Sequence, residues 1–199
     1  MTTRETSASR LARVAAAVRS RPSAVAERDP PYFEAAVALV LRATREDDVE
    51  LLFIKRAARD DDPWSGQIAL PGGRHDPGDA SLEATAVRET LEEVAIDLRT
   101  AGAIVGTLDE LRPRTPVLPP VIVRPFVATL SSDATPEASL EVAELFWAPL
   151  GVILDPSSTR DTEILVRGLR TRRPAIHYHG HVIWGMTERI ITNLRELLS

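Results

Sequence analysis

The sequence predicts one α/β domain in which a mixed β-sheet lies between α-helices. Its 199 residues are 44% hydrophobic and 27% charged, which is enough apolar material for one substantial core. Short apolar, β-branched runs alternate with segments whose apolar residues recur at helical spacing. No internal repeat interrupts this order. We therefore expect an N-terminal helix and linker over residues 1–30, followed by a single domain over residues 31–199.

The overall composition argues against several classes of protein. A net charge of −5 does not suit a dedicated nucleic-acid surface, which is normally basic. The chain has no cysteine, so disulfides, thiolate metal sites and a cysteine nucleophile are excluded. No apolar run is long enough to span a bilayer, and the N-terminus lacks the order of a secretory signal. We expect a cytoplasmic protein with no nucleic-acid or membrane partner.

A basic amphipathic segment lies within the first 30 residues. Its members are Arg4, Arg10, Leu11, Arg13, Val14, Val18 and Arg19. A mitochondrial presequence has this character, and so does a helix that packs on the domain. Lys55 is the only lysine among the 24 basic residues, so arginine is the general cation of this chain and a packing helix is favoured. The prolines of Arg21-Pro22 and Asp29-Pro30-Pro31 then mark a linker.

The first strands follow the linker. Ala35 to Leu41 and Val49 to Ile54 are apolar runs separated by the charged segment Thr44 to Asp48, which predicts a hairpin of two core strands. Gln67 to Leu70 is a shorter strand that leads into Pro71-Gly72-Gly73. Because glycine permits conformations and close approaches denied to other residues, a ligand-facing turn is predicted there.

A central helix begins after Ser81. Ser81 suits the N-cap and Glu83 suits the first turn. The apolar residues at helical spacing are Leu82, Ala86, Val87, Leu91, Val94 and Ala95.

The remaining elements are assigned from the same two periodicities. Strands are predicted over Ala103 to Leu108, Val121 to Leu130 and Glu144 to Trp147, with an irregular, proline-rich loop over Glu110 to Pro120. A further hairpin is predicted from Thr162 to Val166 and Ala175 to Trp184, with Trp184 in the core, and a C-terminal helix from Thr187 to Leu198.

Three carboxylates share one face of the central helix. At about 100° per residue, Glu89, Glu92 and Glu93 fall within roughly 100° of arc, next to Arg88. For such a string alone, a solvated acidic surface is the ordinary interpretation. A carboxylate cluster beside a glycine segment also suits a hard divalent cation, which takes oxygen ligands and leaves positions for water and phosphate. The two features occur together here.

These residues resemble the Nudix box, whose pattern is G-x5-E-x7-R-E-U-x-E-E-x-G-U, with U apolar. The run from Arg88 to Ile96 keeps the R-E-x-x-E-E core. Two positions depart from the pattern: Asp79 stands for the first glutamate, one residue further from Arg88, and Ala95 stands for the late glycine. The resemblance implies a Nudix fold and a hydrolase, dependent on Mg²⁺ or Mn²⁺, that cleaves a diphosphate bond in a nucleotide-containing small molecule.

The resemblance also implies residue roles. It implies metal ligation by Gly72, Glu89, Glu92 and Glu93, and catalytic roles for Arg88, Glu89 and Glu92. Which glutamate acts as the base is open, since a carboxylate close to the metal is a better ligand and a weaker base. Three roles are open for Asp79: a hydrogen bond within the loop, a place around the metal ligands, or the helix N-cap.

Outside the box, the chain resembles the coenzyme A pyrophosphatase-like branch of these proteins. The matching segments are Leu51 to Arg56, Gly66 to Gly73, Val123 to Val127 and Ile183 to Thr187. The resemblance implies coenzyme A or an acyl derivative as first substrate, although Asp62 stands where the branch has an arginine. Alternatives are ADP-ribose, a nucleotide sugar or a nucleoside triphosphate, and a non-catalytic nucleotide sensor. A homodimer is left open.

Four side chains near the glycine segment are candidate substrate contacts: Arg56, Trp64, Arg74 and His75. The run His177-Tyr178-His179-Gly180-His181 also suggests a zinc site, because strand alternation would place its three histidines on one face. No cysteine or carboxylate is spaced with them, so an exposed hairpin is favoured.

Overall fold

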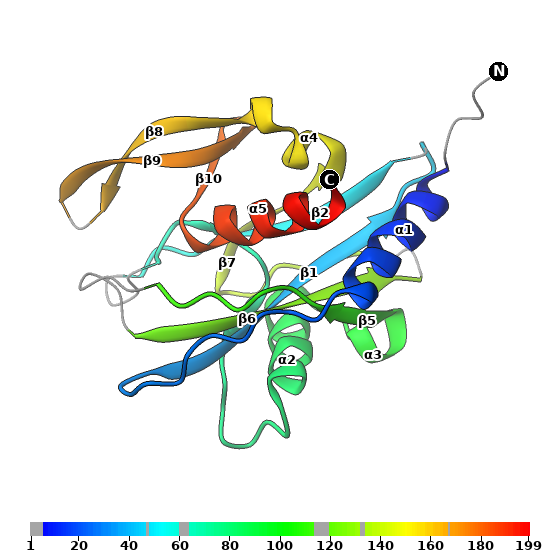
Figure 1. Cartoon of the computed structure of the whole chain (residues 1–199), viewed down its shortest axis with the longest axis horizontal. Coiled ribbons are helices and arrows are strands. Elements are labelled where there is room, and N and C mark those ends of the chain that lie inside the picture. The colour runs from blue at the N-terminus through cyan, green and yellow to red at the C-terminus, as the bar shows by residue number, and fades with distance from the viewer. Residues whose placement is uncertain (1–5, 47, 60–63, 114–119, 132–133, 167) are drawn as a thin grey trace.

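A computed structural model describes residues 6–46, 48–59, 64–113, 120–131, 134–166 and 168–199. A large mixed sheet forms the middle layer (Figure 1). Helix α2 (Leu82–Val94) lies against one face, and α1 (Ser7–Ser20) and α5 (Met186–Leu198) lie against the other. A separate three-stranded sheet lies beside α5. The predicted α/β architecture, a mixed sheet between helices, is confirmed.

The large sheet has seven strands in the order β3-β2-β1-β6-β5, with β4 paired to β1 and β7 to β2. The β1–β6 pair is parallel, and every other pair of this sheet is antiparallel. The strands are β1 (Phe33–Ala43), β2 (Val49–Arg56), β3 (Ile68–Ala69), β4 (Gly72–Arg74), β5 (Gly102–Thr107), β6 (Val121–Leu130) and β7 (Val142–Pro149).

The smaller sheet is antiparallel and has the order β10-β9-β8. It contains β8 (Thr159–Val166), β9 (Leu169–Tyr178) and β10 (His181–Trp184). The predicted strand over Ala175 to Trp184 is therefore wrong, because a turn divides it. His179 has a φ of 45° and Gly180 a φ of 86°, and these left-handed conformations reverse the chain.

Five α-helices and one 3₁₀ turn complete the described part of the chain. They are α1 (Ser7–Ser20), α2 (Leu82–Val94), α3 (Leu98–Ala101), α4 (Leu150–Leu154), η1 (Pro156–Ser158) and α5 (Met186–Leu198). The N-terminal, central and C-terminal helices match their predicted places. The three short elements α3, α4 and η1 were not predicted, because each is too short to display a helical period.

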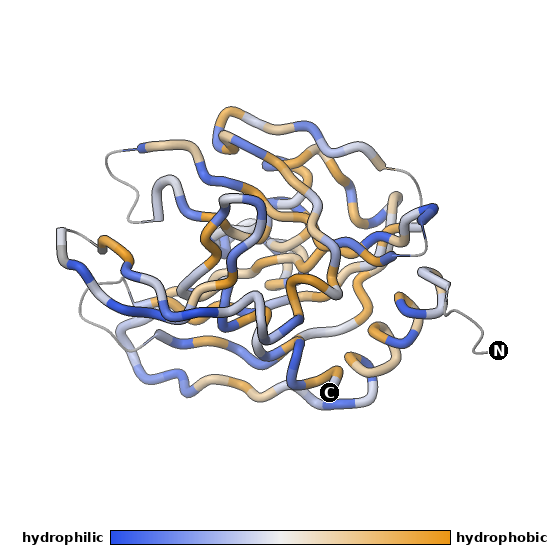
Figure 2. The backbone as a smooth tube through the Cα atoms, turned by 90° about the horizontal axis from the view of Figure 1, so that it is seen from above, coloured by the Kyte–Doolittle hydropathy of each residue, from blue (hydrophilic) through white to orange (hydrophobic). Residues whose placement is uncertain are grey.

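Side-chain alternation along β1 divides the core into two halves. Leu39 and Leu41 pack with residues of α1, α4 and α5. Ala38 and Val40 point the other way and pack with residues at the C-terminal end of α2 and with α3. Hydrophobic residues accordingly follow the central strands and the inward sides of the helices in Figure 2. The N-terminal helix belongs to this core through Val14 and Val18, which are 4% and 3% exposed.

Both ends of α2 have defined caps. The Ser81 hydroxyl accepts a hydrogen bond from the Ala84 amide at 3.1 Å, which confirms the predicted N-cap. At the other end Ala95 has a φ of 57° and donates its amide to the Leu91 carbonyl. A left-handed residue commonly ends a helix in this way, and glycine suits the position best.

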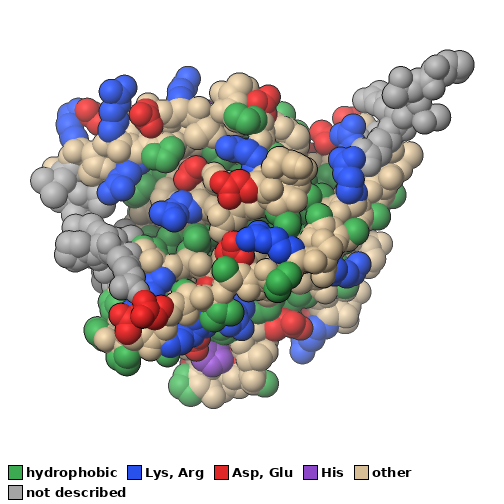
Figure 3. Space-filling view, viewed as in Figure 1, with side chains coloured by type: hydrophobic (Ala, Val, Ile, Leu, Met, Phe, Trp, Pro, Cys, Tyr) green, Lys and Arg blue, Asp and Glu red, His purple; other side chains and the backbone are tan. Residues whose placement is uncertain are grey.

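Acidic and basic side chains are interspersed over the face of the molecule that Figure 3 shows, with basic side chains along the upper edge where β8 and β9 lie. In the described part of the chain, no helix has both the length and the apolar character that a membrane crossing needs.

Candidate active site

The glycines of β4 lie directly against the glutamates of α2. The Gly72 amide donates a 2.8 Å hydrogen bond to the Glu93 carboxylate, across 21 residues of chain. A Cβ placed on Gly73 would come within 2.5 Å of the Glu89 carboxylate. A side chain at either glycine would collide, since a Cβ on Gly72 would meet the Ala36 carbonyl at 2.3 Å. The predicted close approach is confirmed, but Gly72 and Gly73 form a short strand paired with β1 and not a free turn.

Arg88 connects most of the charged groups of the site. Its Nη1 donates to Glu89 Oε1 at 2.8 Å and to Glu92 Oε2 at 2.9 Å. The guanidinium also donates to Asp79, and to the Arg74 carbonyl at 3.3 Å. Charge-assisted bonds of this kind fix direction as well as distance. Arg88 therefore holds two glutamates of the helix in a defined relation to the preceding loop.

Asp79 anchors that loop to the helix. Its side chain is only 7% exposed and accepts hydrogen bonds from the Thr85 hydroxyl and the Asp76 amide in addition to Arg88. The Arg88 guanidinium holds the pKa of the Asp79 carboxyl well below its usual range. Of the roles left open for Asp79, loop bonding is confirmed and the N-cap is wrong, because Ser81 occupies that position.

Glu93 is the most buried carboxylate of the cluster, with a side chain that is 3% exposed. Burial raises its pKa to about 7, against the opposing influence of the Gly72 amide and of Arg56, whose Nη1 lies 3.7 Å away. A carboxylate removed from water without a full counter-charge is costly to ionise. This position therefore favours a proton or an additional cation.

Glu89 and Glu92 differ in exposure. The Glu89 side chain is 16% exposed, and burial raises its pKa although Arg88 opposes that shift. Glu92 is 57% exposed and faces solvent at the rim of the cluster. One helix face thus carries a buried, a half-buried and an exposed carboxylate.

The donor set suits a hard divalent cation, since its side-chain ligands are carboxylates beside a glycine strand that leaves room for close approach. Among the described residues, however, no group of three or more acidic or histidine side chains is arranged ready to hold a metal ion. Instead, Arg88 binds both Glu89 and Glu92 through Nη1, and Glu93 bonds the Gly72 amide. Metal ligation by these residues and by the Gly72 carbonyl stays a prediction.

The four candidate substrate contacts are placed differently. Arg56 faces the cluster beside Glu93, and Trp64 is partly buried in the segment that precedes β3. Arg74 lies over the Phe33 ring, 4.7 Å from its centroid. His75 Nδ1 shares a 2.8 Å hydrogen bond with the Thr85 hydroxyl, which gives this residue a structural contact in the loop. Asp62, at which this chain departs from the coenzyme A pattern, lies outside the described residues.

Glu141, near the site, was missed from the sequence, and its ion pair with Arg59 was not foreseen. Glu141 raises the pKa of both Glu89 and Glu93 by electrostatic repulsion, and Arg59 forms a 3.0 Å ion pair with Glu141. Neither belongs to a recognisable motif, and the two lie 82 residues apart. Only the pairing of β2 with β7 brings their segments together.

The histidine run forms no shared site. His177 contacts the Thr162 hydroxyl and Arg160, His179 lies in the turn, and His181 Nε2 lies 3.3 Å from Glu144. The hairpin that the sequence favoured over a zinc site is present, formed by β9 and β10. Its turn interrupts the strand alternation that would place the three histidines on one face. Trp184, assigned to the core from the sequence, is only partly buried and lines a cavity.

Comparison with known proteins gives consistent results. A family model described as NUDIX domain matches residues 32–167. A protein of Photorhabdus laumondii with the name uncharacterized Nudix hydrolase NudL is 37% identical over 132 residues, which cover 66% of this chain and 68% of that protein. The region that the family model matches includes the glycines of β4 and the whole of α2.

Two solved structures are similar in fold. A MutT/nudix family protein from Enterococcus faecalis superposes with a TM-score of 0.51 at 16% identity, covering 79% of this chain and 52% of the other. A NUDIX hydrolase from Alicyclobacillus acidocaldarius gives a TM-score of 0.51 at 19% identity, covering 62% of this chain and 82% of the other. At these identities the likeness establishes the fold alone.

Proposed function

Because this chain belongs to the Nudix family, we propose that it is a hydrolase that uses Mg²⁺ or Mn²⁺ to cleave the diphosphate bond of a nucleoside diphosphate derivative. Glu89, Glu92 and Glu93 are the proposed metal ligands, together with the Gly72 carbonyl. Arg88, Glu89 and Glu92 are the proposed catalytic residues. The first candidate substrate is coenzyme A or an acyl derivative.

One observation carries this proposal: the R-E-x-x-E-E run lies on the face of α2 that packs against the glycines of β4. An acidic helix face that was only solvated would not bury Glu93 to 3% exposure, because an isolated buried carboxylate costs free energy. It would also not place a glycine where any Cβ would strike Glu89. Burial and close approach together support a site for a cation and an anionic substrate.

The chain's own residues have separable tasks in this proposal. A bound divalent cation supplies positive charge to the diphosphate oxygens and lowers the pKa of a water molecule. Arg88 orients Glu89 and Glu92 through its two Nη1 hydrogen bonds. Glu89, whose pKa burial raises, is suited to accept the proton of the attacking water. Arg56 lies at the edge of the cluster, where a phosphate oxygen could take its hydrogen bonds.

The coenzyme A candidate rests on the segments Gly66 to Gly73 and Ile183 to Thr187. The first forms β3 and leads into β4, and the second joins β10 to α5. Their nearness in space supports a common role, since the Thr187 hydroxyl donates a 3.2 Å hydrogen bond to the Ile68 carbonyl. Against it stands Asp62, which replaces an arginine that could bind the 3′-phosphate of coenzyme A.

A substrate panel tests the reaction class. Coenzyme A, an acyl derivative, ADP-ribose, a nucleotide sugar and a nucleoside triphosphate are incubated with Mg²⁺ or Mn²⁺, and the products are identified by mass spectrometry. Two phosphate-containing fragments from at least one compound are expected. Tight binding of a nucleotide by calorimetry with no cleavage in either metal would instead favour the sensor alternative, against which the intact glutamates now argue.

The ratio of kcat/KM for coenzyme A and dephospho-coenzyme A tests the finer assignment, because the two differ only in the 3′-phosphate. A dedicated phosphate site predicts a preference of about tenfold or more, which equals about 1.4 kcal/mol of transition-state discrimination. Equal rates, or much faster cleavage of ADP-ribose, would show that the coenzyme A resemblance reflects a shared scaffold and a different substrate.

A further inference from the structure

A cavity of about 500 Å³ lies between the large sheet and the small one, in the size range of small-molecule sites. Its walls come from β2, β3 and the segment before β3 on one side, and from β8, β10 and the β9–β10 turn on the other. We propose that this cavity is a second binding site, for an amphiphilic monoanion with an apolar body and one carboxylate. Gly66, Ile68 and Trp184 line it, so it shares parts of the two segments on which the coenzyme A candidate rests, but it is a different place from the glutamates of α2.

The cavity opens on the opposite face of the sheet from the glutamates. Lys55 and Arg56 are consecutive in β2, at a step where the pairing with β7 shifts register, and their contacts place the two side chains on opposite faces of the sheet. Arg56 reaches Glu93 on the α2 face, while Lys55 lines the cavity. The preceding residues follow the same alternation, since Ile54 packs with the end of α2 and Phe53 packs with α5. The two sites are therefore separated by the sheet itself.

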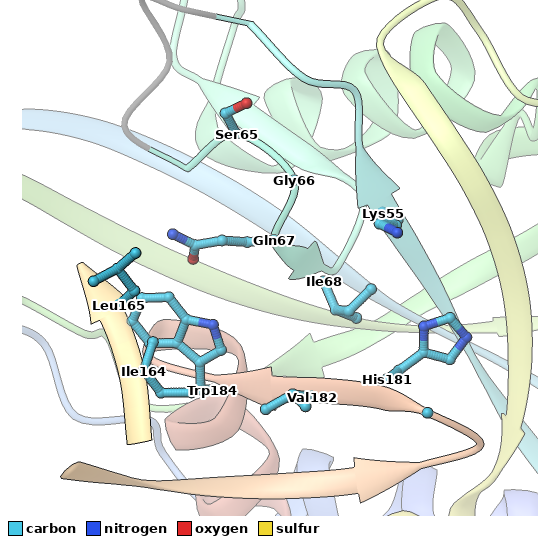
Figure 4. A pocket seen from close by; sticks show the side chains of 11 residues that line it. Lys55, Ser65, Gly66, Gln67, Ile68, Ile164, Leu165, His181, Val182 and Trp184 are labelled. Carbon is cyan, nitrogen blue, oxygen red and sulfur yellow. The ribbon is translucent and has the colours of Figure 1, made fainter. Parts of the chain in front are cut away.

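The two ends of the cavity differ in chemistry. Ile164, Leu165 and Trp184 lie together at one end, toward which the Gln67 side chain also reaches, and Lys55 and His181 lie at the other end (Figure 4). Ile68 and Val182 line the space between them. An elongated ligand with an apolar body and an anionic end matches this polarity, because each end then meets its complement.

The apolar end carries side chains that a folded protein normally covers. Leu165 is 67% exposed, although Ile164 beside it is 9% exposed. Trp184 is only partly buried, so part of its indole remains available to an apolar group. An apolar ligand at this end would remove both surfaces from water, which is favourable.

The basic end holds the only lysine in a chain that has 24 lysine and arginine residues in total. Within the part of the chain that the structure describes, the Lys55 ammonium forms no hydrogen bond or ion pair. The nearest acid by strand register is Glu144, and its carboxylate is 3.3 Å from His181 Nε2. An ammonium is a compact point charge with three donors, which suits the end-on approach of a single carboxylate.

Octanoate, 1-octanol and acetate are the probes for this site, because they separate the charge from the apolar body. Reductive ¹³C-dimethylation of the single lysine keeps its charge and gives an NMR signal at the cavity, identified by its absence in Lys55→Gln. Octanoate is expected to shift this signal saturably. Octanol should bind at least tenfold more weakly, and acetate at the same concentration should leave the signal unchanged.

Variants locate the binding, with affinity measured by calorimetry. Lys55→Gln should lower the affinity for octanoate at least tenfold and leave the affinity for octanol unchanged. Leu165→Asp replaces an exposed side chain, so it should weaken octanoate without lowering the melting temperature. The matched control Arg56→Gln removes the neighbouring charge on the other face and should change octanoate affinity less than twofold.

Three results would overturn the proposal. Octanoate could fail to bind to the unmodified protein, or octanol could bind as tightly as octanoate. Arg56→Gln could weaken octanoate binding as much as Lys55→Gln does, which would place the anion at the α2 face.

Discussion

Both carboxylate oxygens of Asp79 are bonded to the Arg88 guanidinium, Oδ1 to Nε and Oδ2 to Nη2, each at 2.9 Å. This two-point contact orients the arginine whose remaining nitrogen holds Glu89 and Glu92. The loop that enters α2 and the carboxylates on α2 are therefore positioned as one unit. We propose that Asp79 is a positioning residue, which acts through Arg88 and does not itself touch the substrate.

Asp79→Asn should lower kcat at least tenfold with a smaller change in KM, because the guanidinium loses the charge that orients it. Removing one charge of a nearly buried, hydrogen-bonded pair should also cost about 1–3 kcal/mol of stability. Steady-state kinetics and thermal unfolding measure the two effects. Asp76→Asn in the same loop is the control, and Asp79→Glu should recover part of kcat. An equal kcat in Asp79→Asn and in the control would contradict the positioning role.

Glu92→Gln should reduce turnover about a hundredfold, equal to roughly 2.7 kcal/mol of transition-state stabilisation, without lowering the melting temperature. The side chain is 57% exposed, so the fold does not depend on its burial, and its removal relieves repulsion among the carboxylates. Glu83→Gln, an exposed acid in the first turn of the same helix, should keep full turnover. Near-normal turnover of Glu92→Gln at saturating Mg²⁺ would remove Glu92 from the catalytic set.

Millimolar Mg²⁺ or Mn²⁺ with a nonhydrolysable diphosphate should raise the melting temperature, since a ligand at one hundred times its Kd adds about 2.7 kcal/mol. Metal affinity should rise between pH 5 and pH 8, because burial holds the pKa of Glu93 at about 7 and the proton competes with the cation. Calorimetry at both pH values measures this, with Glu93→Gln as the variant that should lose most of the pH dependence. No thermal shift in either metal would mean that the cluster is only an acidic surface.

Glu110 should make the protein sensitive to acid below pH 4.5. Burial opposes its ionisation, but hydrogen bonds from Arg28, from the Ala26 amide and from Arg124 outweigh burial and lower its pKa from 4.5 to about 2. A lowered pKa in the folded state stabilises the fold above pH 4.5, and that stability is lost as the pH falls toward 2. The loss should reach up to about 3 kcal/mol for this side chain, which is 2% exposed.

Denaturant unfolding at pH 5 and pH 2.5 measures this effect. The difference in unfolding free energy between the two pH values should be smaller in Glu110→Gln than in the unsubstituted protein. It should be unchanged in Glu163→Gln, because the ion pair of Glu163 with Arg170 is exposed. The same difference in all three proteins would assign the acid sensitivity to other groups.

Ala95→Gly should stabilise the protein by about 1 kcal/mol. Ala95 has a φ of 57°, a left-handed conformation that strains any residue with a Cβ. Glycine removes that strain, although it also increases the freedom of the unfolded chain and so offsets part of the gain. Ala84→Gly within α2 should destabilise by a similar amount. Equal destabilisation by both substitutions, measured by thermal unfolding, would show that the C-cap strain is negligible.

The local elements of this protein could be predicted from the sequence because their signals are local. The β1–β2 hairpin, the N-cap Ser81 and the face shared by Glu89, Glu92 and Glu93 all follow from spacings of a few residues. The same is true of the R-E-x-x-E-E run, which lies inside the region that the family model matches. Such patterns repeat with the period of the helix or strand, so they can be recognised without knowing which other segments pack against them.

What only the tertiary structure decided is which of these groups are buried, paired or left open. Gly72 meets Glu93 across 21 residues because α2 packs against β4 and β1. Arg59 meets Glu141 across 82 residues because β2 pairs with β7. Burial then raises the pKa of Glu93, which its spacing along the helix does not reveal. The cavity at Lys55 also depends on tertiary structure, because it lies between two sheets. The spacing of residues along the chain reflects only near neighbours, so it does not predict which sheets pack together.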